Sequence, residues 1–205
     1  VVDLATASLS DVTAEGWRAD HPSPYGWLED LAWSGDSSAL AFSISYDGYA
    51  SQIWCAETKN TGLTLQKIAR PEMVTYVGGL TWKGDGRTLC YRGESMAQVQ
   101  VYGVEKVQEA KQGNTKALTS GDQVVAGYSF SHNGKQLAAV VETTTHTNDI
   151  YAYSSPTKGK RLTNVNPQVD TWILPQISHV SWTGADGDIC YGILELPSGY
   201  QPGDG

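Results

Sequence analysis

The sequence predicts an all-β fold, a partial β-propeller of four-stranded antiparallel blades, with about three complete blades and partial blades at both ends. Three observations predict it. One pattern recurs at residues 31–42, 80–91 and 128–139, with a partial copy at 180–191. Its spacing of nearly 50 residues is that of propeller blades, which repeat at roughly 40 to 50 residues. No long stretch has the period of a helix. The aromatic residues that mark the copies are Trp33, Trp82, Phe130 and Trp182.

Each copy is predicted to be a β-hairpin. An alternating apolar strand ends on the aromatic residue, a polar turn reverses the chain, and a second apolar strand returns. Tight hairpin turns need residues that tolerate positive φ. In the first copy Ser37 stands where glycine is expected, which predicts a longer or differently shaped turn there. The other three copies carry Asp85-Gly86, Asn133-Gly134 and Asp186-Gly187.

Two further strands are expected in each complete unit, which gives the four strands of a propeller blade. The third strand alternates apolar and polar residues, and a polar turn leads from it into a short closing strand. Third strands are expected at residues 52–56, 99–103 and 149–153, and closing strands at 65–69, 115–119 and 159–163. The resulting blades cover residues 27–70, 77–120 and 123–164, with a partial blade at 167–191, so that the propeller spans 27–191.

The two ends of the chain do not fit a whole blade. Residues 1–6 have the pattern of a third strand, so residues 1–26 are expected to be the end of a preceding blade and a linker. Residues 192–205 leave the repeat. We therefore expect the chain to be part of a longer protein.

The exit from the repeat resembles a motif of the prolyl oligopeptidase family of serine peptidases, most of all its acylaminoacyl-peptidase and dipeptidyl-peptidase branches. In that family a Trp-Xaa-Xaa-Xaa-Asp-Gly hairpin, an apolar strand and a Pro-Xaa-Gly-Tyr turn lead from the propeller into an α/β-hydrolase domain. The resemblance implies that residues 192–205 are the crossover toward such a domain, which lies outside this sequence. The matching residues are Trp182, Asp186, Gly187, Pro197, Gly199 and Tyr200.

In the family that the chain resembles, the propeller caps the active site and admits peptides, while the hydrolase domain supplies serine, histidine and aspartate. The resemblance therefore implies a peptidase whose propeller portion gates substrate access and holds no catalytic, cofactor-binding or metal-binding residue. The alternative is a non-enzymatic propeller that binds peptides or proteins, because the repeats also suit other propellers, such as periplasmic Tol-associated ones. The sequence beyond residue 205 would distinguish the two.

Two segments resemble the Gly-Xaa-Ser-Xaa-Gly nucleophile elbow of a hydrolase. Ser95 follows a predicted strand, but an elbow needs a helix directly after the serine, whereas residues 98–102 alternate like a strand. Ser129 lies within a repeated first strand. Both serines are predicted to be structural, and a miniature hydrolase built on Ser95 is the least favoured hypothesis.

The titratable side chains form no recognisable catalytic set. Glu29 and Asp30 are predicted to be a solvent-facing pair at the entry of the first blade. A general base needs a nucleophile within hydrogen-bond reach and an acid that orients it. No such partner is identified for any of the four histidines, which are His21, His132, His146 and His179.

The three cysteines lie in predicted strands at spacings that match no metal or redox motif. Cys90 and Cys190 each precede a tyrosine at the same place in their repeats, so they are expected to be equivalent buried core residues. Cys55 is also predicted to be a small core side chain.

Composition and charge narrow the expected partners. The formal net charge is −8, so binding to nucleic acid would need a local basic patch. Residues 158–161 hold three basic side chains, which a solvated turn explains. No stretch approaches the roughly 18 apolar residues of a membrane span. Neither nucleic acid nor a membrane is expected as a partner, and the cytoplasm is favoured over the periplasm.

An incomplete propeller leaves unpaired strands and a bare blade face, because propellers close with roughly four to eight blades. Unpaired strand edges invite pairing with another chain. We therefore expect self-association through these open edges, and peptide substrates as partners of the parent enzyme.

Overall fold

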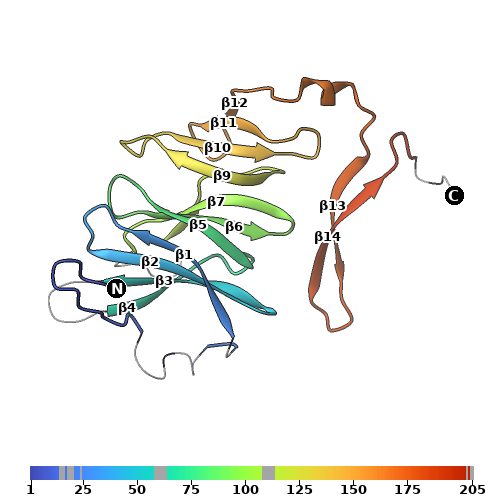
Figure 1. Ribbon diagram of the computed structural model, residues 1–205. Helices are drawn as coiled ribbons and strands as arrows, with labels where there is room; N and C mark the ends of the chain where they lie inside the picture. The colour runs from blue at the N-terminus through green and yellow to red at the C-terminus, as the bar shows by residue number, and fades with distance from the viewer. Residues whose placement is uncertain are drawn as a thin grey trace. The chain divides into compact units, whose positions relative to one another are not determined.

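The computed structural model describes residues 1–13, 17, 21–23, 25–57, 64–107, 114–201 and 203. Over this part of the chain the named elements are fourteen β-strands and one 3₁₀ helix, η3 (Pro167–Thr171) (Figure 1). The predicted all-β class is confirmed. The chain divides into two compact units, Val1–Gly93 with Tyr102–Lys116 and Glu94–Val101 with Ala117–Gly205. The division passes through the second of the predicted blades.

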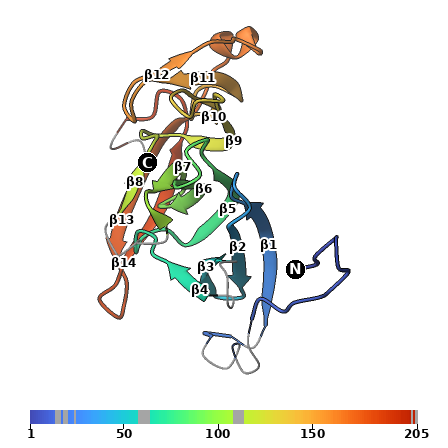
Figure 2. The same cartoon turned by 90° about the vertical axis from the view of Figure 1, so that its left-hand side faces the viewer.

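Unit 1 begins with a four-stranded antiparallel sheet in which neighbours along the chain are neighbours in space (Figure 2). Three strands that are adjacent in a second sheet follow, and a short strand pairs with the last of them. The first sheet contains β1 (Gly26–Trp33), β2 (Ala39–Tyr46), β3 (Tyr49–Glu57) and β4 (Thr64–Ile68). The others are β5 (Tyr76–Trp82), β6 (Leu89–Ser95), β7 (Gln98–Val104) and β8 (Thr115–Ala117), of which the segment Glu94–Val101 and Ala117 belong to unit 2.

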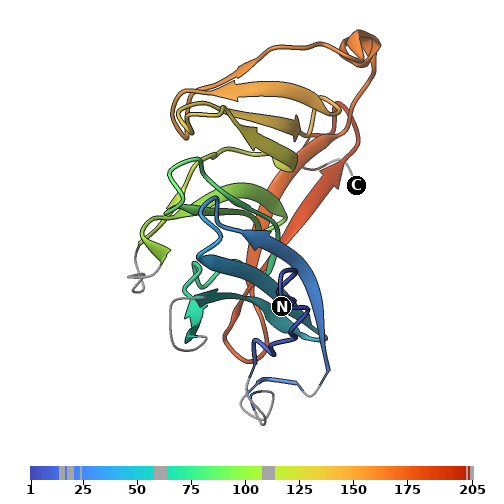
Figure 3. The same ribbon diagram turned by 60° about the vertical axis from the view of Figure 1, so that its left-hand side comes forward.

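Unit 2 contains a second run of four antiparallel strands and then a two-stranded hairpin (Figure 3). One parallel pair, Val99 with Val124, connects β7 to this run. The run consists of β9 (Val124–Phe130), β10 (Leu137–Glu142), β11 (Asp149–Tyr153) and β12 (Gly159–Arg161). The hairpin consists of β13 (Gln176–Thr183) and β14 (Ile189–Leu196).

The core of unit 1 lies between a face of small side chains and a face of large ones. Ala41 pairs with both Ala32 and Cys55 across β1, β2 and β3, so these three residues share one face of the sheet. Large buried side chains, Leu89 and Tyr91, pack against it from β6. Small and large residues thus interlock at this junction, as dense packing requires.

Two polar contacts also join β1 to β5 inside unit 1. The indole Nε1 of Trp82 donates to the carbonyl oxygen of Ala32 at 2.9 Å. The backbone N–H of Gly79 donates to Asp30 Oδ2 at 2.6 Å. Asp30 is therefore no solvent-facing residue, and the prediction for it is wrong. Only Glu29, which lies at the register shift between Leu28 and Asp30, is exposed.

The turn of the first hairpin does not differ from those of the second and third. Ser37 adopts φ of +59°, close to the +64° of Gly86 and the +66° of Gly134. Its N–H donates to Ser34 O at 2.9 Å, as Gly86 N–H does to Lys83 O. Hydrogen bonds from the hydroxyls of Ser38 and Ser34 lower the pKa of Asp36 to about 2 and fasten the same turn. The prediction of a longer or differently shaped turn is wrong, because side-chain hydrogen bonds to Asp36 stabilise a turn in which Ser37 takes the positive φ usually found at glycine.

Ser37 therefore carries backbone strain that glycine would remove. We expect Ser37→Gly to raise the free energy of unfolding by about 0.5–1 kcal/mol. Urea unfolding followed by tryptophan fluorescence measures the change. Gly86→Ser at the same turn position is the matched control and should lower the stability by a similar amount. A loss of stability in Ser37→Gly would contradict the strain argument.

The fourth hairpin is the one that differs. Gly184 N–H donates to Asp188 O, four residues on, whereas the equivalent bonds in the other copies span five residues, as from Ser34 to Ala39. Cys190 consequently pairs with Trp182 and shares its face. At the repeat position of Cys90, the first copy has Ala41, which pairs with Ala32 and lies on the other face from Trp33. Cys90 and Cys190 are therefore not equivalent, and Cys190 is only half-buried.

Two closing strands end sooner than predicted, for a shared reason. β8 and β12 each stop two residues early, just before a Leu-Thr pair. The threonine hydroxyl then replaces a backbone carbonyl as the acceptor. Val101 N–H donates to Thr119 Oγ1, and Ile150 N–H donates to Thr163 Oγ1, both at 2.9 Å.

The chain ends also differ from expectation. Residues 1–6 form no strand, because Asp3 Oδ1 accepts the N–H groups of Ala5 and Thr6 and so turns the chain, leaving one bridge between Val2 and Leu9. At the other end β14 continues to Leu196, so the first five of residues 192–205 belong to the hairpin.

Candidate functional site

An acidic cleft of about 370 Å³ opens in unit 2 between the start of β9, the end of β10 and the β13–β14 hairpin. Three carboxylates line it, those of Asp122, Glu142 and Glu195. Ile177 and Ile193 supply apolar walls from the hairpin. None of the described residues that line it is a lysine or an arginine, so the electrostatic potential of the cleft favours a cationic group.

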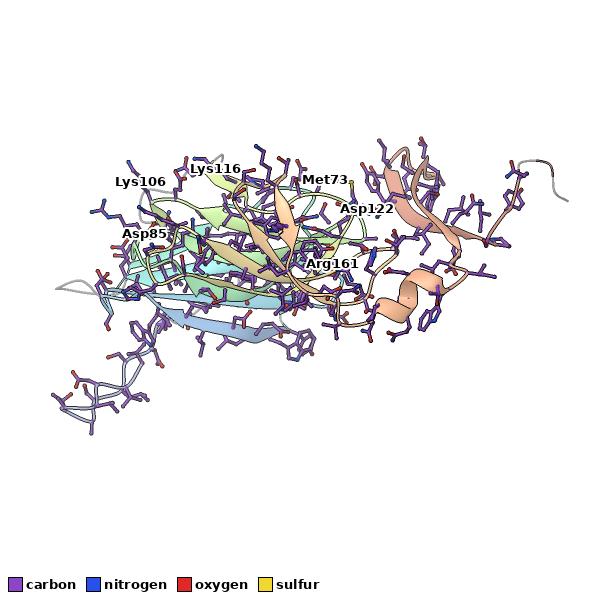
Figure 4. The ribbon with its side chains drawn as sticks, turned by 90° about the horizontal axis from the view of Figure 1, so that it is seen from above. Met73, Asp85, Lys106, Lys116, Asp122 and Arg161 are labelled. Carbon is purple, nitrogen blue, oxygen red and sulfur yellow. The ribbon has the colours of Figure 1, made fainter. Side chains whose placement is uncertain are left out.

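A histidine–aspartate contact crosses the cleft. His179 Nε2 of β13 lies against Asp122 Oδ1, which precedes β9 in the chain by two residues. Gln98 also approaches the same oxygen, at 3.4 Å. Asp122 is labelled in Figure 4. The described lining residues that carry polar side chains are carboxylates, threonines, one glutamine and one histidine, which suit binding of a polar or cationic group.

A buried polar network holds the loop that carries Asp122. Gln123 Nε2 donates to Gln100 Oε1 at 2.9 Å, and Tyr153 donates its hydroxyl to Gln123 Oε1 at 2.9 Å. Gln100 Nε2 donates to the carbonyl of Gly121 at 2.7 Å. Thr119, which is fully buried, donates to Gln100 Oε1 at 2.7 Å. The loop before β9 is thus held in place by hydrogen bonds from Gln100 and Tyr153 of the same unit to Gly121 and Gln123.

Thr119 is a test of this network. Thr119→Val keeps the shape of the side chain but removes the hydroxyl, which leaves the N–H of Val101 and an oxygen of Gln100 each short of one bond. Losing such partners in a buried site costs about 1–3 kcal/mol. We expect that loss in urea unfolding. Thr145→Val, on an exposed loop, should change stability by less than about 0.5 kcal/mol, and an equally silent Thr119→Val would show that the network is not stabilising.

Sequence inspection singled out His179 but not the other residues of the cleft. Asp122, Glu142 and Glu195 are isolated acidic residues in the sequence, and contacts over 57 residues have no local pattern. The signal that could have found Asp122 is its place in the short polar segment immediately before a repeated first strand, where loop residues often bind ligands.

The other histidines are placed as follows. His146 Nε2 lies 3.3 Å from Asp170 Oδ1 of η3. Together with His179 and Asp122, this contact gives two histidines acidic partners that the sequence did not identify. His21 packs among the rings of Trp17, Tyr46 and Trp54. His132 is exposed in the turn between β9 and β10.

Ser95 and Ser129 lie in the structural settings that the sequence predicts. Ser95 is the last residue of β6, and Met96 and Ala97, with φ of +51° and +60°, form a two-residue turn into β7. No helix follows the serine, so the setting of a nucleophile elbow is missing. Ser129 is part of β9.

The basic segment at 158–161 is partly used inside the fold. Arg161 Nε and Nη2 donate to Asp149 Oδ2 at 2.9 and 2.5 Å, and the carboxylate of Asp149 is buried. Arg161 is labelled in Figure 4. Lys158 and Lys160 are the exposed cations of this segment.

The two buried thiols are poor nucleophiles at neutral pH. Burial raises the pKa of Cys55 and that of Cys90 to about 12, so both stay protonated. Among the described residues no group of three or more His, Cys, Asp or Glu side chains could hold a metal ion. Nor does that part of the chain contain a helix long and apolar enough to cross a membrane.

No protein-family model and no curated protein matches the chain. Among solved structures, the AtxE2 isopeptidase is similar with a TM-score of 0.60 and 14% identity over 98% of this chain. The S527A variant of that isopeptidase with astexin3-dC4 bound is similar with a TM-score of 0.59 and 15% identity over 98% of this chain. The chain spans 30% of the length of both isopeptidase chains.

Two further likenesses cover most of the chain. TolB from Acinetobacter baumannii has a TM-score of 0.54 and 15% identity, over 97% of this chain and 48% of its own. A prolyl endopeptidase is similar with a TM-score of 0.55 and 12% identity, and the match covers 86% of this chain and 25% of the endopeptidase chain. At these identities the likeness shows the fold. The predicted propeller class is confirmed, since the chain has the β-propeller architecture of TolB and of prolyl oligopeptidase-type propellers.

Proposed function

We propose that this chain is the propeller portion of a serine peptidase of the prolyl oligopeptidase type and that it gates the access of peptides to a separate catalytic domain. The observation that carries the proposal is the way the repeat ends. After β14, Tyr200 N–H donates to Pro197 O at 3.1 Å, and Gly199 takes φ of +81°. This Pro-Xaa-Gly-Tyr turn after an apolar strand is the exit that resembles the family.

The likeness to the isopeptidase supports the same proposal, because it extends over 98% of the chain. Amide hydrolysis in such enzymes needs an activated serine and an oxyanion hole. Ser95 and Ser129 lie in strands and lack the setting of a nucleophile elbow, so the proposal assigns the chemistry to a separate domain.

Within the proposed division of labour, the acidic cleft of unit 2 is the part of the chain that we assign to peptide contact. Its carboxylates suit a free amino terminus or a basic side chain, while Ile177 and Ile193 suit the aliphatic part of that side chain. A cleft of about 370 Å³ has room for one or two residues of a peptide.

The coding sequence beyond Gly205 is the first test. A His-Gly-Gly segment, a Gly-Xaa-Ser-Xaa-Gly elbow between a strand and a helix, and later Asp and His would support the proposal. Labelling of the full-length protein by a fluorophosphonate, lost when the elbow serine is changed to alanine, would then show the activity. Further blades or an immediate stop would refute it.

A non-enzymatic binding propeller is the second candidate. The likeness to TolB over 97% of this chain favours it. It would share the cleft but show no fluorophosphonate labelling, so the same experiment decides between the two.

The cleft makes a prediction of its own for the full-length enzyme. Asp122→Asn combined with Glu195→Gln should lower kcat/KM about fivefold for peptides with a lysine, an arginine or a free amino terminus, since a partly exposed ion pair contributes up to about 1 kcal/mol. Neutral, acetylated peptides should be unaffected. Glu105→Gln, an exposed residue of unit 1 paired with Lys116, is the control. Equal loss for all peptides would contradict the assignment.

A further inference from the structure

The turn of the third hairpin has an amide where the first two hairpins have a carboxylate. Asn133 stands at the repeat position of Asp36 and Asp85. Its Oδ1 accepts the hydroxyl of Ser131 at 2.8 Å and the N–H of Lys135 at 3.1 Å. Asp36 Oδ1 accepts the equivalent two bonds, from a serine hydroxyl at 2.7 Å and a backbone N–H at 3.0 Å. The first and third turns therefore make the same contacts with an acid and with an amide.

The residue after Asn133 makes this amide reactive. Of the six asparagines in the sequence, Asn133 alone precedes a glycine. The backbone nitrogen that follows an asparagine can attack the side-chain carbonyl carbon, because the ring that forms has five members. Glycine carries no Cβ to obstruct that approach. Asn133 is exposed, so its side chain lies in water beside the least hindered nucleophile that a backbone offers.

The contacts of Asn133 suit such an attack. As the nitrogen of Gly134 approaches Cγ, negative charge builds up on Oδ1, and the donors of Ser131 and Lys135 are aimed at this oxygen. The leaving group is the side-chain nitrogen Nδ2, which donates no hydrogen bond to any residue that the structure describes. The attack requires the hydrogen bond from Gly134 N–H to Ser131 O, 2.7 Å long, to open. It therefore needs local opening of an exposed turn and no unfolding of the blade.

We propose that Asn133 is a self-modification site, at which the turn converts the amide into a carboxylate. The nitrogen of Gly134 bonds to Cγ of Asn133 and gives up its proton to solvent, while Nδ2 takes up a proton and leaves as ammonia. The product is a succinimide ring. Water then adds to Cγ and breaks its bond to the Gly134 nitrogen, which leaves aspartate, or adds to the backbone carbonyl carbon, which leaves isoaspartate. Water is the only co-reactant.

The first hairpin shows which product fits the fold. Asp36 holds the same turn with a carboxylate, and hydrogen bonds from two serine hydroxyls lower its pKa to about 2. An aspartate in the third turn would accept the existing bonds from Ser131 and Lys135 in the same way. Isoaspartate adds a carbon to the backbone of the turn, which would displace the hydrogen bond from Gly134 to Ser131. Aspartate is therefore the product that keeps the hairpin intact.

Mass spectrometry of the folded 205-residue chain, kept in mildly alkaline buffer at physiological temperature, measures the conversion. Trypsin releases residues 117–135 as one peptide, in which Asn133 is the sole asparagine. This peptide should exchange an amide NH₂ for a hydroxyl at least about tenfold faster than the peptides with the other asparagines, because a Cβ on the following residue obstructs the attack. A species that has lost ammonia should precede the acid. An Asn133 that reacts no faster than the other asparagines would overturn the proposal.

Gly134→Ala tests the attacking atom and should slow the conversion about tenfold, since the added Cβ obstructs the approach. Gly134 has a φ of +66°, so this variant also strains the turn. Gly86→Ala, at the equivalent turn position with φ of +64°, is the matched control. It should strain its own turn equally and leave the conversion of Asn133 unchanged. Conversion of Gly134→Ala at the rate of the unchanged chain would exclude the succinimide route.

Two further variants test the amide and the product. Asn133→Gln should abolish the reaction in the peptide 117–135, because its ring would need six members. Asn133→Asp should unfold at the same urea midpoint as the unchanged chain, since the first hairpin already holds a carboxylate at this position. A reaction that persists in Asn133→Gln would place the modification at another residue. A clear fall of the midpoint in Asn133→Asp would overturn the fit of the carboxylate.

Discussion

Replacing Asp149 with alanine is expected to lower the urea midpoint of unfolding more than any surface substitution would, because it removes the acceptor of four hydrogen bonds and one partner of an ion pair. The side chain of Asp149 is 1% exposed. Its Oδ1 accepts the hydroxyl of Thr163 at 2.6 Å and the N–H of Val165 at 2.9 Å, and its Oδ2 accepts two bonds from Arg161. The substitution would leave these donors unpaired at the end of the third blade.

Urea unfolding at neutral pH measures this loss. Asp47→Ala, at an exposed turn residue, is the control and should change stability by less than about 0.5 kcal/mol. If Asp149→Ala cost as little as the control, the carboxylate would have no structural role.

Acid should remove the same stabilisation. The hydrogen bond from Thr163 first, and then those from Val165 and Arg161, hold the pKa of Asp149 below its ordinary 3.8. A folded-state pKa that is depressed stabilises the fold above the unfolded pKa and loses that effect as the pH falls through the folded value. The stability gap between the unchanged chain and Asp149→Asn should therefore be constant above about pH 5 and shrink below about pH 4. A gap that does not vary with pH would contradict the role of the charge.

Tyr91→Ala is expected to lower the free energy of unfolding by about 3–5 kcal/mol, because it opens a large cavity in a packed core. Tyr91 is fully buried between the two sheets of unit 1, and its ring stacks on Tyr102 with centroids 5.6 Å apart. The denaturant midpoint should fall while the slope of the transition is kept. Tyr49→Ala, at a site 56% exposed, is the matched control and should cost less than about 1 kcal/mol.

The location of the damage can also be measured. Tyr91 belongs to unit 1, so amide hydrogen exchange should accelerate in β1 to β6 more than in β9 to β12. Equal loss of protection in both units would mean that they unfold as one and that the core of unit 1 has no stability of its own.

The strands were predictable because their signal is local and repeated. Alternation of apolar residues set the faces, and turn residues such as Gly86 and Gly134 fixed where the hairpins reverse. The repeat also misled, since it implied that Cys190 is equivalent to Cys90. The turn between Gly184 and Asp188 has one residue fewer than the turns of the other copies, which places Cys190 on the opposite face of the hairpin. The copies have the same length in the sequence, so the shorter turn cannot be recognised from the spacing of the repeat.

The candidate site was far less predictable than the fold. The contact of His179 with Asp122 depends on how a late hairpin packs against an earlier loop, which no short pattern encodes. Asp30 was misplaced for the same reason, because its partner Gly79 is 49 residues away. The positive φ of Ser37 was not predicted, because it depends on hydrogen bonds that the side chains of Ser34 and Ser38 make to Asp36.

The early end of β8 and β12 limits what these two outer strands offer to cross-β growth. β8 and β12 each offer a neighbouring molecule only three residues of strand backbone. Beyond them, Thr119 and Thr163 accept with their hydroxyls the N–H groups of Val101 and Ile150 on the inner strands β7 and β11. Cross-β growth needs segments of about six or seven residues that stack in register. The outer edges of β8 and β12 are thus poor templates for cross-β growth.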